Sequence, residues 1–408
     1  MKNYNKKVCV VGLGYIGLPT SALLANKGYA VSGVDIDPEV VEIINQGNIH
    51  IVEPDLDSFV RSAVDSGNLI AYIEPQISDI YIICVPTPFY KDLDIPLPNL
   101  EYVENATDSI SSLVKPGDVI ILESTSPIGT TNKIKQILEK KGVDIDLISI
   151  AYCPERVLPG NIMNELIAND RIIGGISKES TDIVSEFYET FVTGKVLKTS
   201  AETAEMCKLA ENSFRDINIA FANELSMMCS KNGVNVWDLI KLANHHPRVN
   251  ILQPGTGVGG HCIAVDPWFL VAGDPENSKL IKSAREVNSS KPSWVVNKII
   301  EVLEINKIPN KKLKVACLGL AFKPDIDDLR ESPAVEVVQK LINNGIEVLA
   351  VEPNINQSKE FTLTSLDIAI EESDLCVILV KHSLFEEESI KDSLIKCNAI
   401  DFCGSLQS

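Results

Sequence analysis

The sequence predicts an α/β fold in which two Rossmann-like, doubly wound domains are joined by a central helical domain. Short apolar strands alternate with helical stretches in the first half of the chain, as in a parallel sheet covered by helices. Helical periodicity replaces this alternation from about residue 199 to 288, and the alternation resumes at residue 313. We therefore expect domains at residues 1–198, 199–305 and 306–408.

Length and composition support this organisation. The 408 residues suit two or three domains of ordinary size. Hydrophobic residues make up 45% of the chain and charged residues 23%, which excludes disordered and fibrous classes. The net charge of −19 disfavours nucleic-acid binding, because such proteins need a basic surface. An anionic ligand would have to be held by a local cluster of cations and backbone amides.

Neither a membrane span nor a metal site is expected. No apolar run reaches about 18 residues, and glycines break the first apolar stretch, unlike a signal peptide. The 10 cysteines lack paired CxxC spacing, which argues against zinc. A reducing, cytoplasmic setting is expected, because several cysteines lie in apolar runs and should pack as small hydrophobic residues. These are Cys9, Cys84, Cys317 and Cys376.

The first strand and helix are predicted at residues 7–11 and 18–27. KVCVV is rich in β-branched residues, and the stretch after GLGYIG has helical spacing until Gly28. A second strand over residues 29–34 ends at Asp35. Further apolar runs predict strands at residues 80–85, 119–122 and 148–151.

The segment GLGYIG matches a dinucleotide-binding fingerprint. Its residues are Gly12, Leu13, Gly14, Tyr15, Ile16 and Gly17. The motif follows a strand, opens a helix and leads to Asp35 about 20 residues on, so a pyrophosphate would meet the helix N-terminus. Asp35 would accept hydrogen bonds from ribose hydroxyls and repel a 2′-phosphate, which favours NAD over NADP. A methyl-donor cofactor and a tight turn without a ligand are the alternatives.

The last third of the chain repeats the first. Residues 314–324, 346–354 and 373–383 echo residues 7–17, 29–37 and 78–88. The second copy of the turn reads GLAFK, so we expect a bulky aromatic in place of the close-approach glycine and Lys323 to hold a different anion. Together with Arg330 and Arg248, Lys323 offers enough charge for a diphosphate, unless these residues only form surface ion pairs.

Candidate catalytic residues lie in three segments. Cys262 follows the glycine-rich loop 255–260, where solvent and backbone amides can reach a nucleophile; a buried loop cysteine is the alternative. Lys208 and Asn212 share a helix face, which could also be merely solvated. Glu155 follows a strand end, where ligands of α/β sheets bind. Residues 86–88 and 124–127 also follow strands and could equally be simple turns.

Seven motifs occur in order and are similar to those of the UDP-glucose/GDP-mannose dehydrogenase family over essentially the whole chain. They are GLGYIG, PTP, ESTSPIGTT, YCPERVLPG, AEMCKLAENSFRDINIAFANEL, HPRVNILQPGTGVGGHCIAVDPWF and GLAFKPDIDDLRESPA. Within the family, the cysteine loop most resembles that of bacterial enzymes that oxidise UDP-N-acetyl-D-mannosamine. Enzymes acting on UDP-N-acetyl-D-glucosamine are the nearest alternative.

The resemblance implies an oxidoreductase of polysaccharide biosynthesis that oxidises the sugar C6 alcohol to a carboxylate with two NAD. It implies that Cys262 is the nucleophile of a thiohemiacetal and a thioester, and that Lys208 and Asn212 stabilise the oxyanion. Glu155 would act as a general acid or base. Asp266 would orient the cluster, and Thr125 would lie near cofactor and water. The cofactor residues implied are Gly12, Gly14, Tyr15, Ile16, Gly17, Asp35, Thr87 and Thr125.

The resemblance also implies contacts with a UDP-sugar and a homodimer or higher homo-oligomer built on the helical middle. The implied substrate contacts are Glu155, Arg156, Val157, Lys208, Asn212, Arg215, His246, Arg248, Gly259, Lys323 and Arg330. Thr256 stands where close relatives often have proline, which should loosen the cysteine loop slightly. A catalytically dead nucleotide-sugar sensor and a two-electron hydroxyacid dehydrogenase are the alternatives from other classes.

Overall fold

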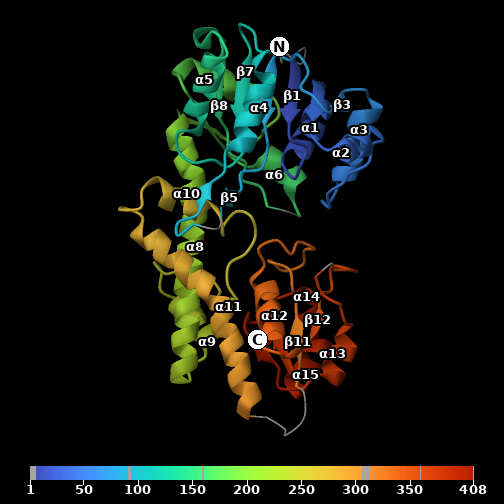
Figure 1. The fold of residues 1–408 in the computed structure, drawn as a ribbon, viewed down its shortest axis with the longest axis vertical. Coiled ribbons are helices and arrows are strands. Elements are labelled where there is room, and N and C mark those ends of the chain that lie inside the picture. The colour runs from blue at the N-terminus through green and yellow to red at the C-terminus, as the bar shows by residue number, and fades with distance from the viewer. Residues whose placement is uncertain (1–5, 91–92, 159, 306–312, 359, 408) are drawn as a thin grey trace. The chain divides into compact units, whose positions relative to one another are not determined.

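The computed structural model in Figure 1 describes residues 6–90, 93–158, 160–305, 313–358 and 360–407. Contacts within the chain divide it into two compact units, Met1–Ala210 and Glu211–Ser408. The boundary falls inside the long helix α8 (Ala201–Asn232). The division into three domains stays a prediction, and the first residues of its last domain, 306–312, lie outside the described residues.

The first unit is built on an eight-stranded sheet with the order β10-β9-β8-β7-β4-β1-β2-β3. Neighbouring strands pair in parallel except β8 and β9. Its strands are β1 (Lys7–Val11), β2 (Ala30–Val34), β3 (Leu69–Tyr72), β4 (Ile80–Ile83), β7 (Val119–Leu122), β8 (Ser149–Tyr152), β9 (Arg171–Gly175) and β10 (Val196–Ser200). The strands predicted here are all present, with ends shifted by at most two residues. The edge strands β3 and β10, and β9 next to β10, are additions to the prediction.

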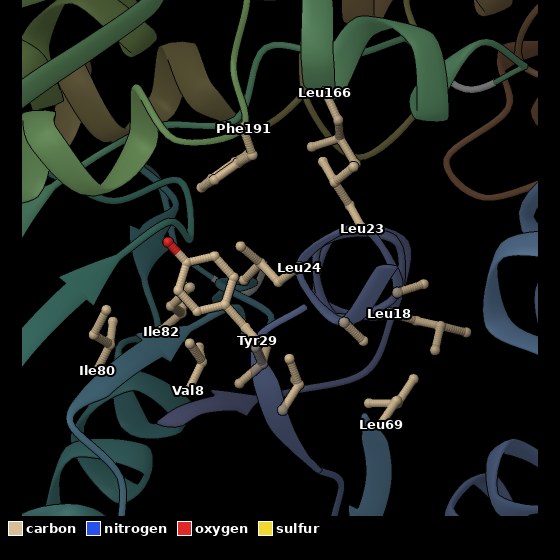
Figure 2. Packing of buried hydrophobic residues seen from close by; sticks show 14 of the residues in the cluster. Val8, Leu18, Leu23, Leu24, Tyr29, Leu69, Ile80, Ile82, Leu166 and Phe191 are labelled. Carbon is tan, nitrogen blue, oxygen red and sulfur yellow. The ribbon is translucent and has the colours of Figure 1, made fainter. Parts of the chain in front are cut away.

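Helices cover this sheet and close two hydrophobic cores. They are α1 (Gly17–Asn26), α2 (Pro38–Asn45), α3 (Leu56–Asp65), α4 (Glu101–Ser111), α5 (Thr130–Lys140), α6 (Ile162–Ala168) and α7 (Lys178–Tyr188), with a 3-10 turn η1 (Ile145–Leu147) and a small hairpin β5 (Phe89–Tyr90) and β6 (Leu97–Pro98). Alternate residues of β1 enter different cores, Val8 and Val10 in one, Cys9 and Val11 in the other. Figure 2 shows Val8 among side chains of the first core, including Leu24 of α1.

The second unit contains a four-stranded parallel sheet with the order β12-β11-β13-β14. Its strands are β11 (Lys314–Leu318), β12 (Glu347–Val351), β13 (Leu375–Ile378) and β14 (Ile400–Asp401). Its short helices are α12 (Pro333–Asn343), α13 (Leu366–Glu372), α14 (Ser383–Glu386) and α15 (Glu388–Lys396). The predicted second strand–helix domain is therefore present.

Helices α8, α9 (Val236–Ala243), α10 (Asp266–Gly273) and α11 (Lys279–Ile305) form the predicted helical stretch. α11 runs well beyond residue 288, where the helical pattern was expected to end. Val295, Ile299 and Leu303 from its second half pack with Val315 and Cys317 of β11. The helix is therefore longer than predicted because its C-terminal half is part of the core under the second sheet.

Candidate active site in two compact units

The turn between β1 and α1 has the geometry of a phosphate-binding loop. Gly12 has φ +95°, and a Cβ there would lie 2.6 Å from the carbonyl oxygen of Cys84. A Cβ at Gly14 would meet no atom within 4 Å, so the backbone is open on that side. α1 has no side-chain cap at its N-terminus and no acidic residue in its first turn. The positive end of the helix dipole is thus left for an anion such as a pyrophosphate.

Asp35 is held at the end of β2 by the same turn. Its Oδ2 accepts from the backbone N–H of Leu13 at 3.0 Å, and its Oδ1 accepts from that of Asp37 at 3.0 Å. The side chain is only partly buried, so its remaining lone pairs can accept from ribose hydroxyls. The residues therefore fit a dinucleotide with a free 2′-hydroxyl.

Three other predicted residues follow the carboxyl ends of neighbouring strands. Thr87 comes after β4, Thr125 after β7 and Glu155 after β8. The hydroxyl of Thr87 donates to the backbone oxygen of Thr125 at 2.6 Å, which ties the first two segments together. The parallel sheet brings these residues to one edge, as expected for ligand-binding positions.

Glu155 is almost fully buried, and both carboxylate oxygens have donors. Oε1 accepts from the backbone N–H of Arg156 at 2.6 Å, and Oε2 forms an ion pair with the guanidinium of Arg171. The ammonium of Lys208 donates to the Glu155 backbone oxygen at 2.8 Å, so α8 and the strand end meet as predicted. Val157 packs against the first core. The guanidinium of Arg156 donates to the Asp170 oxygen at 3.2 Å.

The sequence analysis missed Arg171. This side chain is 1% exposed and also donates to the Leu166 oxygen at 2.9 Å. Burial opposes its charge, but Glu155, Cys153 and Glu123 together hold the pKa of Arg171 above its ordinary value. A lone cation opening the apolar run RIIGG was the available signal, since such a charge must be paired.

Glu123 lies in the same buried cluster as Glu155 and Arg171. It accepts from the hydroxyl of Tyr188 and, at 3.2 Å, from the thiol of Cys84. Burial, and then the charge of Glu155, raise the pKa of Glu123. Glu123 is therefore a second buried carboxyl beside the Glu155–Arg171 ion pair, with a pKa above its ordinary value.

In the second unit, Asn212 and Asp266 meet directly. Asn212 is 7% exposed, and its amide nitrogen donates to Asp266 Oδ2 at 2.5 Å. This is the partner that a buried amide in a helix requires. Asp266 is the first residue of α10, and its backbone N–H donates to the carbonyl oxygen of Cys262 at 2.8 Å. The half-buried Cys262 is therefore fixed one turn before Asp266, as the motif spacing predicted.

The glycine-rich loop before Cys262 is anchored at several points. Gly255 donates to the side-chain oxygen of Asn223 at 3.0 Å, and the Thr256 hydroxyl donates to the Leu379 oxygen at 3.3 Å. Thr256 thus supplies a contact that proline could not make. A Cβ at Gly259 would lie 2.4 Å from the Glu331 oxygen, so this loop packs tightly on the segment that carries Lys323 and Arg330.

The turn after β11 differs from our expectation in one respect. Counted from the ends of β1 and β11, Phe322 matches Tyr15, and Ala321 replaces the glycine at position 14. The expectation that the aromatic replaces that glycine is wrong. Lys323 is half-buried, and no hydrogen bond or ion pair joins it to another described residue, which leaves its ammonium available to an anion.

The other predicted substrate contacts are less organised. Arg330 pairs with Asp328 in its own loop, with nitrogen–oxygen distances of 2.6 to 3.0 Å. Arg215, His246 and Arg248 are exposed. In the described part of the chain, one contact forms within this group: the Arg248 backbone N–H donates to His246 Nδ1 at 3.3 Å. Among the described residues, no contact joins them to Lys323.

Most other thiols are unsuited to nucleophilic chemistry. All 10 cysteines are free. Burial raises the pKa of Cys9 to about 11 and that of Cys376 to about 12, and it also raises the pKa of Cys153, Cys317 and Cys403. A thiol whose pKa is raised by burial carries little thiolate at neutral pH.

No helix among the described residues is both long and apolar enough to cross a membrane. No group of three or more His, Cys, Asp or Glu side chains among them could hold a metal ion.

Known proteins match this chain over most of its length. Residues 6–192, 202–290 and 316–407 match the NAD binding, central and UDP binding domains of the UDP-glucose/GDP-mannose dehydrogenase family. The chain is 52% identical over 404 residues to UDP-N-acetyl-D-mannosamine dehydrogenase of Campylobacter jejuni, covering 95% of this chain and 98% of that protein. It is 51% identical to the protein of the same name from Escherichia coli strain K12, covering 93% and 94%.

Solved structures agree with this assignment. UDP-D-ManNAc dehydrogenase from Pyrococcus horikoshii superimposes with a TM-score of 0.90 at 39% identity, covering 98% of this chain and 96% of that one. UDP-N-acetyl-mannosamine dehydrogenase from Staphylococcus aureus gives a TM-score of 0.86 at 44% identity, covering 93% and 90%. The chain therefore belongs to the UDP-glucose/GDP-mannose dehydrogenase family.

Proposed function

We propose that this protein oxidises UDP-N-acetyl-D-mannosamine at C6 to UDP-N-acetyl-D-mannosaminuronate. The observation that carries the proposal is 52% identity over nearly the full length of a UDP-N-acetyl-D-mannosamine dehydrogenase. The reactive set Cys262, Lys208, Asn212 and Glu155 is intact, which argues against a catalytically dead sensor. A loop cysteine fixed by its neighbours argues against a simple two-electron dehydrogenase, which needs no thiol.

The reaction removes two hydrides from C6, adds one water and, because the product is a carboxylate, releases three protons from the alcohol and the water. The first oxidation converts the alcohol to an aldehyde, and the Cys262 thiolate adds to the aldehyde carbon to form a thiohemiacetal. Loss of the second hydride gives a thioester. Water breaks the carbon–sulfur bond, which releases the carboxylate and the thiol. NAD, when bound, accepts the hydride in each oxidation.

We assign four further residues to this chemistry. Lys208 and Asn212 hold the C6 oxygen and stabilise its developing negative charge. Asp266 orients the Asn212 amide through their hydrogen bond. Glu155 acts on the water that hydrolyses the thioester. The ion pair with Arg171 fixes the Glu155 carboxyl in place for this role.

The NAD contacts proposed are Gly12, Gly14, Tyr15, Ile16, Gly17, Asp35, Thr87 and Thr125. The UDP-sugar contacts proposed, besides Glu155, Lys208 and Asn212, are Arg156, Val157, Arg215, His246, Arg248, Gly259, Lys323 and Arg330. The open turn at Gly14 and the available ammonium of Lys323 support these assignments. We also propose that Arg330 must exchange its pairing with Asp328 for a phosphate.

A cytoplasmic homodimer completes the proposal. Phe214, Phe221 and Met228 recur every seven residues on α8 and are 69%, 50% and 60% exposed in the single chain. An apolar stripe of this spacing matches the seam of two packed helices. A second copy of the chain is the partner that would cover it.

The test follows reduction of NAD by absorbance with UDP-N-acetyl-D-mannosamine, UDP-N-acetyl-D-glucosamine and UDP-glucose side by side. Two NADH per sugar are expected with the first substrate. No reduction, or one NADH per sugar at completion, would contradict the proposal. Faster oxidation of UDP-N-acetyl-D-glucosamine would favour the alternative substrate.

The Cys262→Ser variant tests the covalent step. Turnover should nearly vanish, while UDP-sugar and NAD still bind in calorimetry, because the substitution changes one atom. Cys207→Ser is the matched control, since Cys207 is also a half-buried free thiol but lies on α8. Full oxidation by Cys262→Ser would remove the thiol from the mechanism.

A further inference from the structure

In each repeated half of the chain, a carboxylate after the second strand accepts hydrogen bonds from backbone N–H groups of the turn after the first strand. We call this arrangement a carboxylate cradle. In the first, Asp35 accepts from the backbone N–H groups of Leu13 and Asp37. In the second, Glu352 follows β12 as Asp35 follows β2. Its Oε2 accepts from Leu320 and Ala321 at 2.7 and 2.9 Å, and its Oε1 accepts from Asn354 at 3.0 Å. The carboxylate thus fixes the turn in both halves.

The two cradles differ in what else the carboxylate meets. Asp35 is partly buried, with capacity left for a ribose. Glu352 is 5% exposed, and its Oε2 also lies 3.1 Å from Nε2 of His382, which is 0% exposed. His382 is the repeat counterpart of Thr87, because residues 373–383 echo residues 78–88. In the second cradle, therefore, a histidine of the protein itself takes the place on the carboxylate that the first cradle leaves to a ligand.

The protonation form of His382 follows from its neighbours. Its Nδ1 lies 3.0 Å from the backbone nitrogen of Asp325, which can only donate, and 3.0 Å from the side-chain amide of Asn354. Nδ1 must accept, so the proton is on Nε2 and is donated to Glu352. Burial opposes the charge of Glu352, but hydrogen bonds from His382 and the turn lower its pKa, so it is a carboxylate.

His382 thereby fixes both ends of the segment that carries Lys323. At one end Glu352 holds the amides of residues 320 and 321. At the other end Asp325 donates to His382, has φ +59°, and accepts from the backbone and hydroxyl of Ser383 at 2.9 and 2.5 Å. Lys323 lies between these anchors on a stretch with little freedom to move.

We propose that His382 is a positioning residue for UDP, holding residues 319–325 in the shape in which Lys323 binds the diphosphate. The inference rests on the proposed function only in taking Lys323 as a UDP contact. The match of residues 316–407 to a UDP binding domain places His382 inside the relevant fold. The second cradle thus holds a loop in shape, whereas the carboxylate of the first keeps lone pairs available to a ribose.

The experiment measures UDP binding to the full-length His382→Ala variant by calorimetry, together with steady-state kinetics. Losing the hydrogen bonds of His382 to Glu352 and Asp325 should raise the dissociation constant for UDP, and KM for the UDP-sugar, by about tenfold or more. KM for NAD and kcat should change less than about threefold, which is clearly less than the tenfold change expected for UDP. Added imidazole should restore UDP binding, because it can refill the space and bridge Glu352 to Asp325.

Phe385→Leu is the matched control. Its ring lies edge-on to His382, 5.6 Å away and also fully buried, but the substitution removes no hydrogen bond. UDP binding like that of the wild type in folded His382→Ala would overturn the proposal. Equal weakening in both variants would assign the loss to packing and overturn it as well.

A third variant decides the question if His382→Ala does not fold. Ser383→Ala removes one anchor of Asp325 near the surface and should weaken UDP binding about threefold, a fraction of one hydrogen bond. No weakening would overturn the proposal. A wild-type protein that binds UDP but oxidises no UDP-sugar would refute the proposed function and leave the His382 result interpretable.

Discussion

Lys291 is predicted to destabilise the second unit at neutral pH, and replacing it by methionine should show this. The side chain is 2% exposed in α11, where its ammonium donates to Ser226 and lies 4.0 Å from the centre of the Trp294 ring. Burial lowers the pKa of Lys291 from 10.5 to about 7. In the described part of the chain, no carboxylate pairs with this ammonium.

The magnitude follows from linkage. A lysine whose pKa falls on folding destabilises the folded state most below its folded pKa, and the effect disappears as pH rises from about 7 towards 10.5. Each pKa unit is worth about 1.4 kcal/mol, so the full effect is on the order of 4–5 kcal/mol. A desolvated cation–π contact offsets about 2 kcal/mol of it. Lys291→Met should therefore stabilise the unit by about 2–3 kcal/mol at pH 7.

Urea unfolding followed by tryptophan fluorescence measures this prediction. The 3 tryptophans, Trp237, Trp268 and Trp294, all lie within residues 211–408, so the signal reports on the second unit. The gain of Lys291→Met at pH 7 should shrink towards zero by about pH 10, close to the ordinary pKa of lysine. The hydrophobic difference between the two side chains does not change with pH, so the shrinkage isolates the charge.

Lys298→Met is the matched control. Its ammonium lies 5.9 Å from the same Trp294 ring, but it is 32% exposed and bonded to Glu301. This variant should show no comparable pH-dependent gain. A gain for Lys291→Met that is equal at pH 7 and pH 10, or a loss at pH 7, would refute the reasoning.

Two further predictions concern the first unit and the oligomer. Arg171→Met leaves the buried Glu155 without its counter-ion and should lower the free energy of unfolding by about 3–5 kcal/mol in urea titrations followed by circular dichroism. Unchanged stability would contradict the buried ion pair. Phe221→Glu places a charge in the apolar stripe of α8 and should yield monomers in analytical ultracentrifugation, whereas a persisting dimer would place the interface elsewhere.

The predicted strands were found where apolar runs are continuous. β1 (KVCVV) and β4 (IYII) are buried on both faces, so their composition identifies them without knowledge of their neighbours. β9 (RIIGG) and β10 (VLKTS) contain glycine or charge, and they are strands because β9 pairs with β8 and β10 pairs with β9. Local composition cannot reveal pairing that depends on a distant partner.

The residues of the candidate site, like the strands, fall into those that the sequence predicts and those that it does not. Glu155 was predicted because ligands of parallel sheets bind beyond the carboxyl ends of the strands, and Asp35 because an acidic residue follows the GLGYIG fingerprint by about 20 residues. Arg171 was missed because β9 runs antiparallel to β8 and returns the chain to Glu155 from 16 residues away. Residues at the carboxyl ends of parallel strands can be predicted from the sequence. A partner such as Arg171, which an antiparallel strand brings to the site, cannot.

The internal repeat shows why similar sequences can support different chemistry. Aligning the halves pairs Asp35 with Glu352 and Thr87 with His382, and the sequence alone suggests that the second turn keeps its first glycine, Gly319, and lost the other two. The structure shows that the carboxylate keeps its hold on the turn amides in both halves. What changed is the group that uses the remaining lone pairs of the carboxylate. With His382 bound there, an adenosine ribose has no acceptor left in the second cradle, so recognition must move to side chains such as Lys323.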